Sequence, residues 1–95
     1  MPKFTYPIVF ILNPDTNWYN GYVPDLAVFS EGEKLEDVYA EAEELMLAYL
    51  TLATKYDAEI PTPSSLEEVS TKWAGYKVSL VSAATNDQQK KSKKA

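Results

Sequence analysis

Apolar side chains occupy both alternating sets of positions in the first extended segment, residues 4–12. One set consists of Phe4, Tyr6, Ile8, Phe10 and Leu12, and the other contains Thr5, Pro7, Val9 and Ile11. A two-residue period predicts a strand, and apolar residues on both faces predict a central one. Because proline has no backbone N–H to donate, Pro7 indicates that the start of this strand is unpaired on one side or lies at the end of the sheet.

Two further strands follow through turn-forming residues. Residues 13–17 are rich in Asn, Asp and Pro and predict a turn, so residues 18–23 return as a second strand. Residues 26–29 predict a short third strand, and Ser30 to Gly32 should turn the chain out of the sheet. Gly21 indicates a bulge or a close approach by another backbone. These segments predict a three-stranded antiparallel meander.

From residue 35 to residue 56 the apolar positions recur with a helical period, which predicts an amphipathic helix of about six turns. Its acidic residues lie on the opposite side, and Glu36 and Asp37 fall in the first turn, where the helix dipole favours carboxylates. Leu47 lies within the acidic side, flanked there by Ala40 and Ala48, and no core requirement explains it. We therefore expect Leu47 to contribute to an interface.

A shorter helix and a last strand complete the predicted fold. Two prolines within residues 60–63 end the long helix, and Ser64 with Glu67 forms a capping box that opens a short helix to about Trp73. Gly75 should end this helix, and residues 76–83 alternate as one further strand. We predict an α+β domain over residues 1–84, of order β-β-β-α-α-β, with both helices on one face and the final strand in the same sheet. Residues 85–95, with four lysines and no periodicity, predict a disordered tail.

Composition limits the remaining classes of function. Of the 95 residues, 45% are hydrophobic and 13% aromatic, which is typical of one folded domain. The chain lacks cysteine and histidine, so disulfides, thiolate metal sites and chemistry based on either residue are excluded. Acids are absent from the strand interiors, so we predict no metal, no cofactor and no catalysis. No apolar run approaches the roughly 20 residues that span a bilayer, and we expect a cytoplasmic protein without membrane contact.

The charge of the chain is unevenly distributed. The net charge is −5, but residues 1–84 hold five lysines against thirteen carboxylates, a net charge of −8. Arginine is absent, which removes the usual bidentate ligand of guanine and of phosphate. This balance argues against nucleic acid as a ligand of the folded part and favours a basic partner.

Several short segments, taken together, carry a resemblance to a known family. They are residues 6–10, 24–26, 30–32, 35–38 and 60–64, in the order strand, strand, strand, long helix, short helix, strand. Over residues 4–81 the chain resembles the HicB family of antitoxins. The resemblance implies a partial RNase H-like sheet that commonly self-associates and that binds and neutralises a small basic HicA-type ribonuclease.

The chain departs from the family pattern at three places. The Pro-Gly-Cys that usually follows Pro-Asp-Leu is here only Ala27 and Val28, one residue shorter, and Gly21 replaces an apolar strand residue. Many members continue into a ribbon-helix-helix or helix-turn-helix domain, whereas this sequence continues into lysines, so we expect no sequence-specific DNA binding by this chain. The partner-contacting loop should therefore differ from that of relatives.

Candidate site residues come from exposed aromatic, acidic and apolar positions. The expected partner-binding set is Trp18, Tyr19, Asp25, Glu31, Glu36, Asp37 and Leu47. Each has a plainer alternative: an Asp after proline commonly caps a turn, the other acids can form a solvated helix start, and half of the aromatics belong to the core by alternation. Val9 and Ile11, on the strand face away from the long helix, would stay exposed in a monomer, so we expect them in a homodimer interface.

Two hypotheses of different class follow. The first is a non-catalytic antitoxin that binds a small basic mRNA-cleaving toxin and occludes its active surface. The second is a stand-alone dimeric adaptor of the same fold whose partner is not a ribonuclease. A short basic reading frame beside the gene favours the first, and its absence favours the second.

Overall fold

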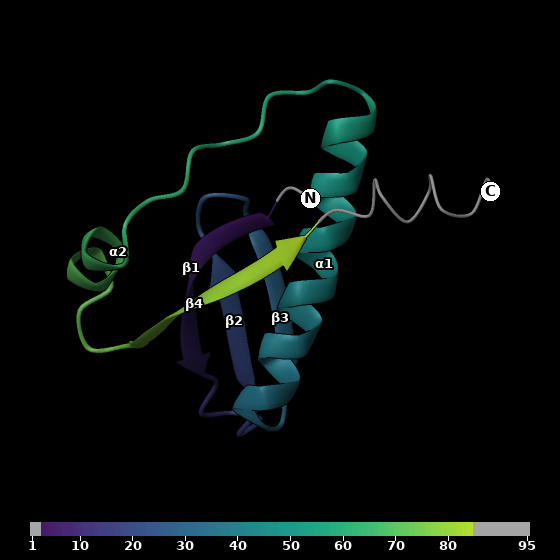
Figure 1. The fold of residues 1–95 in the computed structure, drawn as a ribbon. Coiled ribbons are helices and arrows are strands. Elements are labelled where there is room, and N and C mark those ends of the chain that lie inside the picture. Colours follow the sequence, from purple (N-terminus) through teal and green to yellow (C-terminus); the bar gives the residue numbers. More distant parts are fainter. Residues whose placement is uncertain (1–2, 85–95) are drawn as a thin grey trace.

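The computed structural model describes residues 3–84, which form one antiparallel sheet of four strands in the order β3-β2-β1-β4, with two helices (Figure 1). The elements are β1 (Lys3–Leu12), β2 (Tyr19–Val23), β3 (Val28–Gly32), α1 (Leu35–Lys55), α2 (Leu66–Lys72) and β4 (Lys77–Ala84). The predicted class, element order and single sheet are confirmed. No helix in this part of the chain is long and apolar enough to cross a bilayer. The tail expected at residues 85–95 lies outside the described residues.

Strand β1 is central, as its two apolar faces predict. It pairs with β4 from Lys3 to Phe10, whereas its register with β2 begins only at Val9. Pro7 therefore has no partner residue in β2. Because nothing among residues 3–84 on that side could accept a hydrogen bond from an N–H at this position, the proline costs the sheet no hydrogen bond there. The prediction that the start of this strand is unpaired on one side is confirmed.

Helix α1 packs its apolar stripe against one face of the sheet. Val38, Ala42, Met46 and Leu50 are fully buried and recur every fourth residue along the helix. They share one hydrophobic core with side chains from β1, β2 and β4, which include Tyr6, Ile8, Phe10, Val23 and Val81. Helical periodicity alone predicted this contact, and α1 ends within a residue of the predicted position.

Gly21 in β2 lets α1 approach the sheet closely. A Cβ built on Gly21 would lie 2.5 Å from Cγ1 of Val38, 2.7 Å from Oγ of Ser30 and 3.1 Å from Cδ1 of Ile8. These distances leave no room for a methyl group, which explains the glycine in place of an apolar residue. The prediction of a bulge or of a close approach by another backbone is wrong, because Gly21 pairs regularly with Phe10 and Ser30 and the atoms nearest to it belong to side chains.

Strand β3 begins later than the hydrophobic pattern predicted. The backbone N–H of Leu26 donates to the carbonyl of Val23 at 3.2 Å, and Ala27 has a positive φ of 55°, so these residues form a turn. The side chain of Leu26 is buried although the residue belongs to a turn. An apolar residue at this position therefore extended the apparent strand pattern by two residues. The prediction that Ser30 to Gly32 leave the sheet is wrong, because Ser30 pairs with Gly21 inside the ladder.

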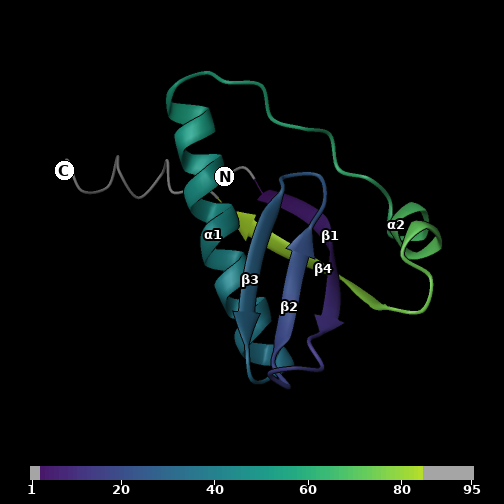
Figure 2. The same ribbon diagram turned by 180° about the vertical axis from the view of Figure 1, so that it is seen from behind.

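The two helices lie on opposite sides of the sheet (Figures 1 and 2). The Trp73 ring at the end of α2 meets the ring of Tyr22 at 5.7 Å, and Tyr22 belongs to the face that points away from α1. The prediction of both helices on one face is therefore wrong in the placement of α2. Its seven residues include one buried side chain, Val69, so its sequence pattern held little information about which face it covers.

Candidate partner-binding surface

Five of the seven predicted partner-binding residues lie at the end of the molecule where α1 begins. They are Trp18 and Tyr19 at the start of β2, Glu31 in β3, and Glu36 and Asp37 in the first turn of α1. Strand pairing and helix packing join them, because Tyr19 pairs with Gly32, and a Cβ built on Gly32 would lie 2.9 Å from Cβ of Asp37. We define the α1-start surface as six exposed residues at this end, one aromatic residue, four acids and one lysine: Trp18, Glu31, Glu33, Lys34, Glu36 and Asp37.

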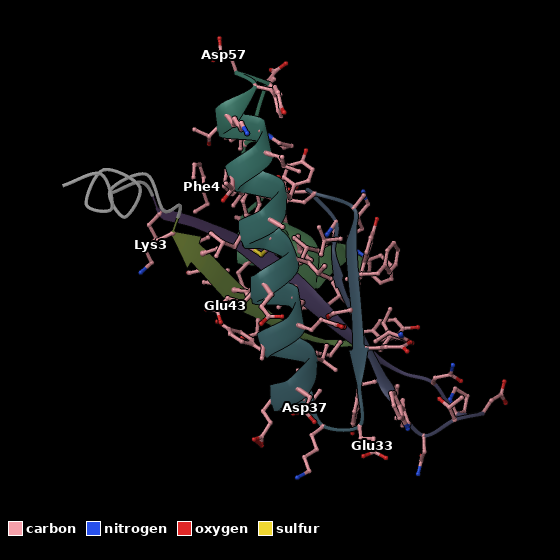
Figure 3. The ribbon with its side chains drawn as sticks, turned by 90° about the vertical axis from the view of Figure 1, so that its right-hand side faces the viewer. Lys3, Phe4, Glu33, Asp37, Glu43 and Asp57 are labelled. Carbon is pink, nitrogen blue, oxygen red and sulfur yellow. The ribbon has the colours of Figure 1, made fainter. Side chains whose placement is uncertain are left out.

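Carboxylates dominate the α1-start surface, and Figure 3 shows Glu33 and Asp37 together at this end of α1. The N-cap residue Lys34 makes no side-chain hydrogen bond to the helix, so Glu36 and Asp37 in the first turn offset the helix dipole. Both remain exposed to solvent. Helix stabilisation and partner binding are therefore compatible roles for these two acids.

Glu31 stands beside Phe29 on the outermost strand of the sheet. Its backbone N–H donates to Oε1 of Glu41 on α1 at 2.8 Å, which satisfies a donor that an edge strand would otherwise leave open. The Glu31 side chain itself is exposed. Its carboxylate is thus available to a partner while its backbone is held by α1.

Tyr19 belongs mainly to the core, as its alternating position allows. Its half-buried ring packs against the hydrophobic cluster under α1. Together with Leu12, Leu35 and Tyr76 it also lines a hollow of about 410 Å³ beside the α1-start surface. Trp18, by contrast, is 40% exposed, so a partner could contact its ring directly.

Asp25 lies away from this surface and has a structural role. Its Oδ2 accepts a hydrogen bond from the backbone N–H of Ser64 at 2.9 Å, and its Oδ1 accepts one from the Ser64 hydroxyl at 2.7 Å. The two bonds hold the α1–α2 segment against the β2–β3 turn. Because Ser64 is occupied in this way, the capping box forms one residue later, at Ser65 and Glu68. The prediction of a capping box at Ser64 and Glu67 is therefore wrong by one residue.

Leu47 is also separate from the α1-start surface, about 15 Å along the helix axis from Asp37. It is half-buried against the core and borders a hollow of about 440 Å³ with Glu43 and Ala83. The expectation that Leu47 has no role in the core is wrong. The end of β4 runs past this side of α1, so Leu47 packs against the core there. Its contribution to an interface stays a prediction.

Val9 does not remain exposed in a single chain. Its exposed fraction is 0%, because α2 and its flanking residues cover this face of β1. The expectation that Val9 needs a second copy for burial is therefore wrong. Ile11, two residues along the same face, is half-buried.

The phenol of Tyr6 is the titratable group that the fold perturbs most clearly. Burial, followed by the charges of Asp25 and Tyr49, raises the pKa of Tyr6 above its ordinary value of 10.0. The hydroxyl donates to the carbonyl of Pro61 at 2.7 Å, which requires the protonated form. Tyr6 thus holds the α1–α2 segment in place. Among residues 3–84, no three acidic side chains lie close enough to hold a metal ion.

Four aromatic side chains form a continuous strip on the face away from α1, which we call the aromatic strip: Phe29, Tyr22, Trp73 and Tyr76. Tyr22 stacks on Phe29 at 4.5 Å between ring centroids, and Trp73 meets Tyr22 at 5.7 Å and Tyr76 at 5.8 Å in edge-to-face contacts. Sequence reasoning missed the strip because three separate segments contribute to it. The alternation of β2 and β3 around Gly21 and Ser30 was the signal that could have placed Tyr22 and Phe29 together.

Solved structures share this fold. The N-terminal domain of the Burkholderia pseudomallei antitoxin HicB is 26% identical, with a TM-score of 0.73 over 82% of this chain and 95% of that one. A second structure of that antitoxin has 26% identity and a TM-score of 0.72; the match covers 82% of this chain and 61% of the other. A chain of a toxin–antitoxin complex from Streptococcus pneumoniae has a TM-score of 0.72 at 20% identity, over 87% of this chain and 70% of that one. No curated protein sequence matches the chain.

The fold and surface define a small acidic α+β domain built on a four-stranded antiparallel sheet. Residues 6–95 match the family described as HicB_like antitoxin of bacterial toxin-antitoxin system. Because this match covers most of the sequence, the chain belongs to that family.

Proposed function

We propose that this protein is an antitoxin that binds a small basic ribonuclease of the HicA type and occludes its RNA-binding surface, without chemistry of its own. The observation that carries the proposal is the cluster of exposed carboxylates at the α1-start surface, in a chain that belongs to an antitoxin family. A ribonuclease must present cations to bind phosphates. An acidic surface can occupy those cations and exclude RNA.

The α1-start surface supplies two kinds of contact. Its carboxylates steer a basic partner and accept hydrogen bonds from its cations. Trp18, at 40% exposure, adds an aromatic side chain of the kind that anchors interfaces. We propose that binding takes place in the cytoplasm and that this chain makes no sequence-specific contact with DNA.

We also propose that the protein self-associates through the outer edge of β4, beside which no strand of residues 3–84 lies. Pro7 lies opposite Leu80, and the Leu80 carbonyl accepts a hydrogen bond from the Tyr39 hydroxyl at 3.0 Å. The backbone polar groups of Leu80 therefore point away from β1, towards the open edge. An edge strand of eight residues can pair with another copy across this side.

An adaptor whose partner is not a ribonuclease is the second candidate. It is favoured by the shortened β2–β3 turn, where Ala27 adopts a positive φ of 55° in place of the family's Pro-Gly-Cys. A changed turn of this kind can alter which partner fits. The identity of the neighbouring reading frame separates the two candidates.

Growth rescue tests the antitoxin proposal. The short reading frame beside the gene is expressed alone and with this protein, and we expect growth arrest in the first case and rescue in the second. The variant Glu31→Gln, Glu36→Gln, Asp37→Asn should rescue poorly. Its matched control, Glu43→Gln, Glu44→Gln, Glu59→Gln, removes the same three charges elsewhere and should rescue normally. Absence of rescue by the unaltered protein would contradict the antitoxin function. Equal rescue by both variants would contradict the α1-start surface as the binding site.

A further inference from the structure

The aromatic strip shares no residue with the α1-start surface, and Glu31 lies on the boundary between the two. Phe29 is 64% exposed and Tyr76 is 48% exposed, whereas Tyr22 and Trp73 are half-buried. The outer members of the strip therefore lie open on a surface whose inner members are fixed by packing. We propose that the strip is a docking surface for arginine side chains of a basic partner protein, an inference that rests on the proposed antitoxin function and extends it to a second contact surface.

The ring geometry suits a planar cation. Tyr22 and Phe29 are nearly parallel, with an interplanar angle of 21°, so one face of Phe29 contacts Tyr22 and most of the remaining ring meets solvent. Trp73 holds Tyr22 from the other side at 68°. A guanidinium group stacks on an aromatic face and retains its edge N–H groups for hydrogen bonds. The strip is pre-organised for this contact because ring–ring packing fixes its central side chains.

Carboxylates border the rings. Glu31 follows Phe29 by two residues and lies on the same face of β3, where it pairs with Asn20. A hollow of about 730 Å³ next to Trp73 is lined by Glu67, Glu68 and Lys72, and Oε1 of Glu68 already accepts a hydrogen bond from the backbone N–H of Ser65. Each of these acids can accept the edge N–H groups of a guanidinium whose plane rests on a neighbouring ring.

Lys72 lies beside Tyr22 and Trp73, but no cation–ring contact between Lys72 and the strip is found among residues 3–84. Lys72 lines a smaller hollow with Tyr22, Pro24 and Trp73. The cation–ring contact found among residues 3–84 is instead that of Lys55 over Tyr56, at the far end of α1. Within residues 3–84 the rings of the strip therefore have no cation partner, and a planar cation from another molecule can stack on them.

The charge of the chain indicates which molecule brings that cation. A second copy can bring lysines but no planar guanidinium group, because the sequence contains no arginine. A nucleic acid would bring phosphates to an acidic border, which is repulsive. A basic protein with exposed arginines is the occupant that matches both the rings and the carboxylates.

A peptide titration tests the strip without any toxin. In a Trp18→Phe background, Trp73 is the single tryptophan of the chain, so its fluorescence reports on the strip. We expect a hexa-arginine peptide to change this fluorescence saturably and to bind more tightly than hexa-lysine. Phe29→Ala should weaken hexa-arginine binding about two- to fivefold. Phe29→Leu, which keeps apolar bulk and removes the ring, should weaken it similarly.

Tyr56→Ala is the matched control, because Tyr56 is 70% exposed and lies outside the strip. It should leave hexa-arginine binding unchanged. Equal binding of the two peptides, or equal effects of the Phe29 and Tyr56 variants, would overturn the inference.

The purified toxin provides the second arm. If the unaltered chain binds it and Phe29→Leu binds it about two- to fivefold more weakly, the inference is supported. If both bind equally, the inference is overturned while the antitoxin function stands. If neither binds, the antitoxin function fails, and the peptide titration alone decides the chemistry of the strip.

Discussion

Replacing Gly21 by alanine is the sharpest test of how α1 is seated on the sheet. The added Cβ would lie 2.5 Å from Cγ1 of Val38 and 2.7 Å from Oγ of Ser30, and both neighbours are buried. The Ser30 hydroxyl also donates to the Val38 carbonyl at 3.0 Å, so displacing Ser30 strains a buried hydrogen bond. Forcing one extra methyl into such a site typically costs about 1–3 kcal/mol, and losing the bond about 1 kcal/mol more.

The intrinsic preference of a strand for alanine over glycine returns about 0.5–1 kcal/mol. We therefore expect a net loss of about 2 kcal/mol in the free energy of unfolding for Gly21→Ala. For a domain of this size, that loss lowers the melting temperature by about 8–16 °C. Urea denaturation followed by far-UV circular dichroism measures the free energy directly.

A double-mutant cycle shows whether the clash is the cause. Val38→Ala removes the nearest atom, so its effect and that of Gly21→Ala should not add, with a coupling of about 1 kcal/mol or more. Gly75→Ala provides a contrast, because no atom lies within 4 Å of an added Cβ and its φ of +93° makes alanine costly through backbone strain alone, so its effect should add to that of Val38→Ala. If Gly21→Ala were as stable as the unaltered protein, a clash at this site would be refuted. If the effects of Gly21→Ala and Val38→Ala were strictly additive, Val38 would be excluded as the source of the clash.

Three further predictions concern the segment between the helices, the alkaline limit of stability and the free edge. Asp25→Ala should lower the free energy of unfolding by about 1.5–3 kcal/mol and speed proteolysis near Ser64, with toxin affinity unchanged; equal proteolysis rates would contradict the clamp. Because the pKa of Tyr6 is raised above 10.0 in the folded state, its stabilising effect is complete below pH 10 and is lost as the pH rises through the folded pKa. Alkaline denaturation should therefore be steeper for the unaltered protein than for Tyr6→Phe, and coincident curves would exclude this origin. Leu80→Pro should convert a dimer to a monomer, as measured by light scattering. The circular dichroism spectrum should be preserved, because the N–H of Leu80 faces away from β1 and its loss breaks no bond within the sheet. An unchanged mass would place self-association elsewhere.

Periodic features of the sequence predicted the main packing of the molecule. The stripe at Val38, Ala42, Met46 and Leu50 repeats over several turns, so its inward direction follows from local geometry alone. Pro7 likewise indicated where β1 lacks a neighbour, because the missing N–H is a property of the residue itself. Such features hold regardless of what the remainder of the chain does.

Features decided by distant contacts could not be predicted in the same way. Ser64 and Ser65 are each followed three residues later by a glutamate, so both fit the capping-box pattern, and the hydrogen bonds from Ser64 to Asp25 decide between them. The face covered by α2 depends on the ring of Trp73 reaching Tyr22, some fifty residues earlier in the chain. For the same reason the α1-start surface was largely predicted from adjoining segments, whereas the aromatic strip was not.

Inhibition of the neighbouring toxin by the purified protein tests the antitoxin function directly. Toxin and messenger RNA are incubated with increasing amounts of this protein, and the fraction of RNA left intact is measured at two salt concentrations. We expect complete protection once binding is saturated, with weaker protection at higher salt because exposed carboxylates carry part of the interaction. Cleavage at the full rate in the presence of excess protein would contradict the antitoxin function.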